Sequence, residues 1–106
     1  MLVKRKVLNM KEQKINMGEV FVTAGINARM DQSEEFSKEI VLSLHQYESG
    51  DWGSTSEEDA LLNDRSVKDG TGDIMGAYET SEGRIWIKTD RSPEKTITTV
   101  LFPSEY

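Results

Sequence analysis

The chain has 106 residues and a mass of 12.0 kDa, which fits one small domain with one core. It contains no cysteine, so disulfide bridges, thiolate metal sites and cysteine nucleophiles are excluded, and we expect a cytoplasmic location. No apolar run approaches the roughly 18 residues that a membrane span needs, and the sequence predicts neither a membrane segment nor a targeting signal.

The net charge of −6 is unevenly distributed along the chain. Residues 1–17 carry five basic residues and one acidic residue, whereas residues 18–106 carry eight basic and 18 acidic residues. The stretch from Glu48 to Glu82 holds ten acids and two bases, and we expect these carboxylates to share one outward surface. Because a negative field repels phosphate backbones and attracts basic protein surfaces, the sequence predicts a protein partner and no direct nucleic-acid contact.

The first 17 residues fit the helical and strand periodicities equally poorly. We expect a basic arm or an added edge element over residues 1–17, ahead of a single domain over residues 18–106. Within that domain, the β-branched and aromatic run from Val20 to Thr23 predicts a first strand, and a buried one. Gly25 and Asn27 follow at once and are typical of a turn.

A helical spacing of apolar residues marks the middle of the chain. Ser33 offers an N-cap oxygen, and two carboxylates follow it where the positive end of a helix favours them. The apolar residues that repeat at helical spacing are Phe36, Ile40, Leu44 and Tyr47. The pattern predicts a helix over residues 33–47, with Gly50 as its stop.

A second helix is predicted to begin after Thr55. Ser54 and Thr55 each precede a glutamate at the spacing of a capping box, and Gly70 ends the pattern. The residues expected on its thin apolar face are Ala60, Leu61 and Val67.

The final third of the chain changes from helical spacing to alternation. Three short β-favouring runs cover residues 74–78, 84–89 and 96–102. In the middle run Ile85 and Ile87 alternate with Trp86 and charged residues, as expected of a half-buried strand. The predicted architecture is α+β, in the order β-α-α-β-β-β, with a C-terminal antiparallel meander packed against two helices.

The tetrapeptide Gly50-Asp51-Trp52-Gly53 is the most distinctive local feature. We favour the interpretation in which Asp51 bonds turn amides and Trp52 fills the core, since Trp is highly buried on average. The alternative is a surface anchor, because a Trp flanked by carboxylates is a common type of hot spot for a basic or aromatic partner.

Enzymatic signatures are sparse. The sequence lacks a Ser-His-Asp pattern, a phosphate loop, a dinucleotide fingerprint and a calcium loop, and it predicts no metal and no cofactor. His45 lies in the last turn of the first predicted helix, where it would stabilise the helix dipole. The alternative is a small ribonuclease toxin of the barnase or RelE type, with His45 as general acid or base and Arg84 or Arg91 supporting the phosphate.

The turn from Gly50 to Gly53 and the tail from Thr98 to Pro103 form a distinctive pair of segments. Further stretches of the same pattern lie at residues 21–23, 25–27, 58–59, 63, 77–78, 85–87, 90–92 and 105–106. Together these segments resemble a family of short proteins of uncharacterised function, labelled plasmid-related, that are carried by conjugative elements, plasmids and phages. Two features depart from the family pattern: residues 1–17 are additional, and Pro93 to Ile97 lengthen the connection after Arg91.

The resemblance implies a mobile-element setting, in which small acidic proteins frequently bind and block host defence proteins. Anti-CRISPR and anti-restriction inhibitors are similar in size and charge. We therefore expect a non-enzymatic accessory protein whose acidic face occupies the positive channel of a host nuclease. The residues expected to contact the partner are Asp51, Trp52, Glu57, Glu58, Asp59 and Asp64. A further alternative is a subunit of a larger assembly that pairs through an exposed strand edge.

Overall fold

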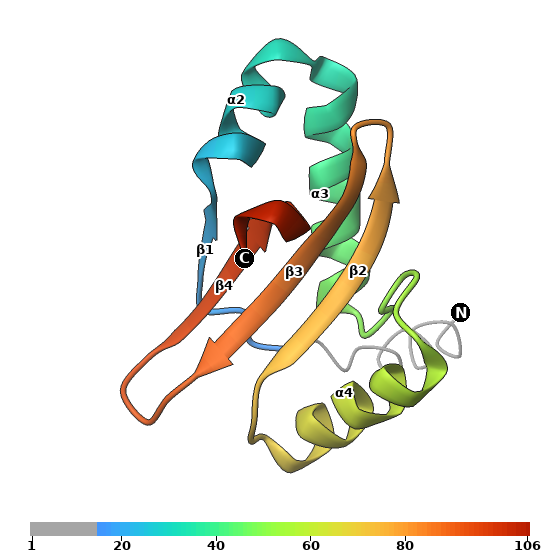
Figure 1. The fold of residues 1–106 in the computed structure, drawn as a ribbon. Helices are drawn as coiled ribbons and strands as arrows, with labels where there is room; N and C mark the ends of the chain where they lie inside the picture. Colours follow the sequence, from blue (N-terminus) through green and yellow to red (C-terminus); the bar gives the residue numbers. More distant parts are fainter. Residues whose placement is uncertain (1–14) are drawn as a thin grey trace, which may run out of the picture.

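Four strands form one sheet in the computed structural model, which describes residues 15–106 (Figure 1). The C-terminal strands β2 (Ile74–Thr80), β3 (Gly83–Arg91) and β4 (Thr96–Leu101) pair antiparallel. Strand β1 (Glu19–Val22) joins the other side of β4 in parallel, so the spatial order is β1-β4-β3-β2. The predicted α+β class and the C-terminal meander are confirmed.

Helices α2 (Ala24–Gln32) and α3 (Glu34–Glu48) cover one face of the sheet. Helix α3 lies behind the sheet in Figure 1, and α2 lies across its upper end. Alternation along β3 places Ile85 and Ile87 in the core, where both are fully buried, and leaves Trp86 on the opposite face, as predicted. One face of the sheet is therefore packed and the other is largely uncovered.

Strand β1 is confirmed, but the prediction that it is buried is wrong. Val20 and Phe21 are 40% and 51% exposed. An apolar run on both sides of a strand is typical of a central position, whereas β1 lies at the edge and pairs with β4 alone. Burial here depends on the strand order, which the run of residues 20–23 does not specify.

Helix α2 replaces the turn that the sequence suggested after β1. The Thr23 hydroxyl caps the helix by accepting a hydrogen bond from the Ile26 amide at 3.4 Å, and the Glu105 carboxylate accepts one from the Gly25 amide at 3.0 Å. Ile26 is fully buried. Packing and a cap from the far end of the chain outweigh the low helix propensity of Gly25 and Asn27.

A chain of hydroxyl groups crosses the core between α3 and the sheet. The Tyr47 hydroxyl lies 2.6 Å from Thr89 Oγ1, which lies 2.7 Å from Thr98 Oγ1, and Thr98 donates to the Met17 carbonyl at 2.7 Å. Burial raises the pKa of Tyr47, so this hydroxyl remains neutral. Each group can donate to the next, which fixes β3 and β4 against α3 without an unsatisfied polar atom.

The body of the domain includes residues ahead of the predicted boundary at 18. Ile15 is 6% exposed, and its amide donates to the Glu48 carbonyl at 3.0 Å. Most of the predicted basic arm, residues 1–14, lies outside the described residues. Residues 15–17 belong to the packed body because Ile15 and Met17 both contact the core.

Helix α4 (Glu57–Asp69) lies across the lower end of the sheet in Figure 1, beside the edge strand β2. Its predicted start after Thr55 is confirmed, and Gly70 ends it with a positive φ of 72°. Of the helices in the described part of the chain, none combines the length and apolar character needed to cross a membrane.

Candidate functional site

Helix α4 turns a polar residue towards the sheet and two leucines towards the solvent. Asn63 is 7% exposed, whereas Leu61 and Leu62 are 64% and 54% exposed. The prediction that Leu61 packs inward is wrong, while Ala60 and Val67 do pack against the core. Since a surface helix ordinarily buries its apolar stripe, the contacts of Asn63 must explain this orientation.

Asn63 and two neighbours of α4 seal the outer edge of β2. The Asn63 side-chain amide donates to the Met75 carbonyl at 2.9 Å and accepts from the Met75 amide at 3.3 Å, as a neighbouring strand would. Thr55 Oγ1 accepts from the Ala77 amide at 2.9 Å, and the Ser54 amide donates to the Ala77 carbonyl at 2.7 Å. These contacts close an edge that would otherwise invite pairing, and they fix the rotation of α4.

The first turn of α4 is acidic and exposed. Ser56 caps the helix, one position after the predicted capping pair, and its hydroxyl accepts from the Asp59 amide at 3.1 Å. Carboxylates are favourable at this positive helix end. We define the α4 surface by four exposed residues on the outer side of the helix: Glu57, Glu58, Leu61 and Leu62.

Three of the predicted contact residues serve the turn and the core. Asp51 Oδ1 accepts from the Gly53 amide at 3.1 Å. Trp52 is 6% exposed, packs edge-on against Tyr47 with ring centroids 5.5 Å apart, and donates from Nε1 to Asp64 Oδ1 at 2.8 Å. The core interpretation of the turn is confirmed, and Trp52 as a surface anchor is wrong because its ring is buried.

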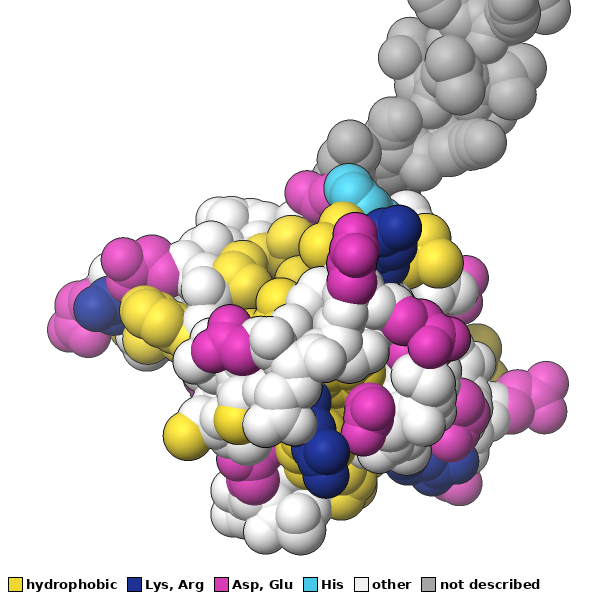
Figure 2. Space-filling view, turned by 90° about the horizontal axis from the view of Figure 1, so that it is seen from above, with side chains coloured by type: hydrophobic (Ala, Val, Ile, Leu, Met, Phe, Trp, Pro, Cys, Tyr) yellow, Lys and Arg dark blue, Asp and Glu magenta, His cyan; other side chains and the backbone are white. Residues whose placement is uncertain are grey.

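The acids of the Glu48–Glu82 stretch do not share one surface. Glu79 accepts from Arg84 Nε at 2.6 Å, and this contact holds the pKa of the Glu79 carboxyl below its usual range. Glu82 lies 3.6 Å from the Arg29 guanidinium at the far end of the hairpin. Figure 2 shows acidic side chains at several separate places on the face seen from above. The expected single acidic surface is wrong, because several of these acids are held in separate local contacts.

His45, the single histidine, lies on the exposed side of α3 (cyan in Figure 2). Helix α3 covers the sheet face that carries Ile85, so Arg84, the preceding residue on β3, projects to the opposite face. Arg91 instead reaches α4, where its Nη1 donates to the Ser66 carbonyl at 3.5 Å. The structure thus does not bring His45 and Arg84 together as the ribonuclease interpretation requires.

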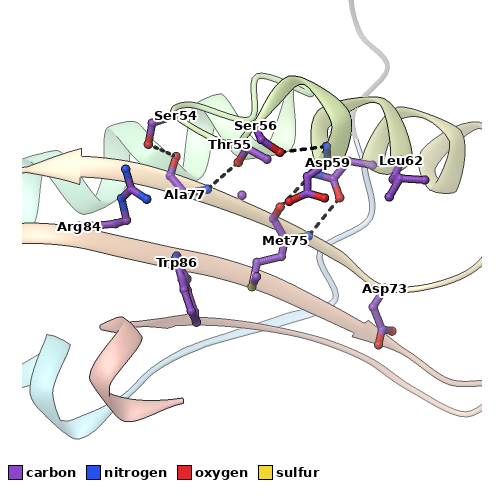
Figure 3. A pocket seen from close by; sticks show the side chains of 12 residues that line it. Ser54, Thr55, Ser56, Asp59, Leu62, Asp73, Met75, Ala77, Arg84 and Trp86 are labelled. Carbon is purple, nitrogen blue, oxygen red and sulfur yellow. Dashed lines mark hydrogen bonds between the residues drawn. The ribbon is translucent and has the colours of Figure 1, made fainter.

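A groove of about 590 Å³ runs between α4 and the uncovered face of the sheet (Figure 3). Its floor is apolar, because Met75 and Trp86 project to the same side of the sheet and Leu62 borders it from α4. Asp59 reaches towards it from the first turn of α4, and Asp73 stands where β2 begins. The groove adjoins the α4 surface and shares Leu62 with it.

Trp86 belongs to a small aromatic cluster on the uncovered face. Tyr106 packs edge-on against it, with ring centroids 5.6 Å apart. Lys88 Nζ lies 5.3 Å from the centre of the Tyr106 ring and 3.2 Å from Asp90 Oδ1. This face of the sheet therefore already holds one cation between an aromatic ring and a carboxylate.

Neither the groove nor the outward position of the leucines was predicted from the sequence. One signal was present, since Asn63 follows Ala60 by three positions and precedes Val67 by four, which places it on the inward stripe of the helix. Nothing local indicates that α4 and Trp86 border the same groove, because they come from distant segments of the chain. Within residues 15–106, no three His, Asp or Glu side chains gather where they could hold a metal ion.

Comparisons with protein-family models, with curated proteins and with solved structures return no match. The geometry of the α4 surface and of the adjoining groove therefore carries the functional argument. The groove lies on the sheet face that α2 and α3 leave uncovered, and the α4 surface lies beside the edge of that face.

Proposed function

We propose that this chain is a non-enzymatic binding protein that attaches to a partner protein through the α4 surface. The observation that carries the proposal is the orientation of α4, with Leu61 and Leu62 in solvent and Asn63 turned inward. When a partner covers exposed apolar side chains, the free energy of the complex falls by about 25 cal/mol per Å² of buried apolar area. The neighbouring carboxylates of Glu57 and Glu58 favour a partner with a basic rim.

The partner that fits this surface presents an apolar groove bordered by basic residues. Residues 15–106 carry eight basic and 18 acidic residues, a balance of −10, which adds a long-range attraction to such a partner. Nucleic-acid-binding proteins hold phosphate backbones in channels of this charge. Occupation of such a channel would inhibit the partner, which is the anti-CRISPR or anti-restriction type of activity. The mobile-element setting implied by the family resemblance supports this class.

The test is capture of partners by the purified chain from the organism that carries it. The variant Glu57→Lys/Glu58→Lys reverses two charges of the α4 surface. Glu34→Lys/Glu35→Lys is the matched control, because it reverses two exposed charges in the first turn of α3. Both pairs disturb a helix dipole to a similar extent, about 0.3–1 kcal/mol per charge, so a difference between them reports partner contact.

We expect a nucleic-acid-binding protein that the wild type and the α3 control retain and the α4 variant loses. Its activity on nucleic acid should fall when the wild-type chain is added in excess. Retention by the α4 variant equal to that of the wild type would contradict the proposal. Equal loss in both variants would also contradict it, because binding would then follow net charge alone.

A further inference from the structure

The groove beside the α4 surface combines the two features by which proteins hold a guanidinium ion. Asp59 and Asp73 supply carboxylates, and Trp86 supplies an aromatic ring. A guanidinium forms paired hydrogen bonds with carboxylates and stacks on aromatic rings. Arg84 also borders the groove, but its charge is balanced by Glu79 at 2.6 Å and so opposes a second cation only weakly.

We propose that this groove takes an arginine side chain from a basic segment of the partner protein. The guanidinium would face the carboxylate of Asp59 and stack on Trp86, and its alkyl stem would lie against Met75. Asp73, whose Oδ1 accepts from the Arg91 amide at 3.2 Å, adds a second negative charge to the groove. The inference rests on the proposed function, and it names the chemistry that the partner presents next to the α4 surface. The pairing of Lys88 with the Tyr106 ring and a carboxylate on the same sheet face follows the same chemistry.

Charge selects this occupant over the others that an apolar groove could take. A phosphate or an acidic peptide would meet the carboxylates of Asp59 and Asp73 and be repelled. An uncharged apolar segment would remove Asp59 from water without offering it a partner, which is unfavourable. A cationic side chain with an apolar stem satisfies both the rim and the floor of the groove.

The two tryptophans provide a direct readout, because each gives one indole N–H signal in a ¹⁵N-labelled sample. Trp52 is buried and bonded to Asp64, whereas Trp86 lines the groove. In a titration of the full chain with an octa-arginine peptide, we expect the Trp86 signal to shift saturably and the Trp52 signal to stay. An octa-lysine peptide should bind at least about threefold more weakly, since an ammonium ion does not form paired hydrogen bonds with a carboxylate or stack on a ring.

Asp59→Asn removes one carboxylate of the groove with little change in shape, and we expect it to weaken octa-arginine binding about tenfold. Glu35→Gln is the matched control, because it removes one exposed carboxylate from the first turn of α3, and it should change the affinity less than about twofold. Trp86→Leu removes the aromatic ring and should also weaken octa-arginine binding. Its affinity is followed through the backbone amides that line the groove, and the amide spectrum of each variant is the check on folding. A Trp86 signal that does not move, or equal losses in Asp59→Asn and Glu35→Gln, would overturn the inference.

Failure of this inference is distinguishable from failure of the proposed function. If capture is lost in Glu57→Lys/Glu58→Lys but unchanged in Asp59→Asn and Trp86→Leu, the α4 surface binds the partner and the groove does not. If the Trp86 signal shifts with octa-arginine but the Glu57→Lys/Glu58→Lys variant still captures the partner, the groove binds arginine and the α4 surface is not the partner site.

Discussion

Trp52 lies in the core and Leu61 lies in solvent, although hydrophobicity alone would place both inside. Trp52 can be buried because its indole N–H finds the Asp64 carboxylate at 2.8 Å. Leu61 is turned outward because Asn63 takes the inward position on α4 and bonds both backbone groups of Met75. At the scale of single residues, hydrogen bonding to fixed partners decides which apolar side chains remain available for binding.

Truncation of these two residues should have opposite consequences. We expect Trp52→Ala to lower the free energy of unfolding by about 3–5 kcal/mol, because it empties a core position. Leu61→Ala should change it by less than about 0.5 kcal/mol while weakening partner capture. Urea denaturation followed by circular dichroism measures the first quantity. A cost above about 2 kcal/mol for Leu61→Ala would mean that Leu61 packs inward, contrary to the site described above.

Glu105 gives the fold a predictable pH dependence. Its carboxylate accepts from the Thr23 hydroxyl at 2.6 Å and from the Gly25 and Phe102 amides at 3.0 Å each. These bonds, that of Thr23 first, hold the pKa of the Glu105 carboxyl below its usual 4.5. A depressed folded-state pKa stabilises the fold above pH 4.5, and this contribution is lost as the pH falls through the lower value.

We expect Glu105→Gln to be less stable than the wild type near neutral pH and to approach it as the pH falls below 4.5. Urea midpoints measured between about pH 7 and about pH 3 give both curves. Glu35→Gln controls for the loss of one exposed carboxylate. A difference between Glu105→Gln and the wild type that does not vary with pH would show that the carboxylate charge is not what matters.

At the scale of elements, the local patterns predicted most of the fold. The observed α3 starts and ends within one residue of the predicted range 33–47, and the three runs of the meander became β2, β3 and β4. Helix α2 was missed because Gly25 and Asn27 are typical of turns, and because the local cap of Thr23 is supplemented by Glu105 from the other end of the chain. Local propensity contains no information about such a contact.

The candidate site was predicted only in part, for a similar reason. Glu57, Glu58 and Asp59 were expected at a helix start, and consecutive residues of one turn necessarily lie together. The outward leucines and the groove depend on how α4 docks beside Trp86 and β2. The spacing of Ala60, Asn63 and Val67 indicates which side of α4 faces inward, but it does not indicate that this side bonds the edge of β2.

The role of Asn63 at the edge of β2 can be tested by removing its side-chain amide. Asn63→Ala should lower the free energy of unfolding by about 1–3 kcal/mol, because it leaves two backbone groups of Met75 without their partner. The Met75 amide should then exchange with solvent faster than the inward-bonded amides of β2. Asn27→Ala, at an exposed position of α2, is the control and should change neither quantity. Unchanged exchange at Met75 would contradict the role of Asn63 as an edge seal.

At the scale of the whole molecule, the charge acts at long range even though its carboxylates are spread over several contacts. The described residues carry a net charge of −10, and the resulting electric field accelerates the approach of a basic partner before any contact forms. Contact then depends on the smaller α4 surface and its leucines. The two contributions can be separated by kinetic measurements, because charge mainly changes the association rate and apolar contact mainly changes the dissociation rate.

Raising the salt concentration from about 0.05 M to about 0.5 M should therefore slow association with the captured partner about tenfold or more. Leu61→Ala should mainly speed dissociation, with the association rate changed less than about twofold. Surface plasmon resonance with the immobilised partner measures both rates. Association that is insensitive to salt would contradict the part assigned to charge.

Hydrogen exchange of the chain with and without its captured partner tests the account most directly, because it maps the contact surface without substitutions. We predict that the amides of α4 (Glu57–Asp69) become protected in the complex, while those on the outer side of α3 around Val41 and His45 do not change. Protection on α3 or β1 with α4 unchanged would contradict the claim that α4 binds the partner.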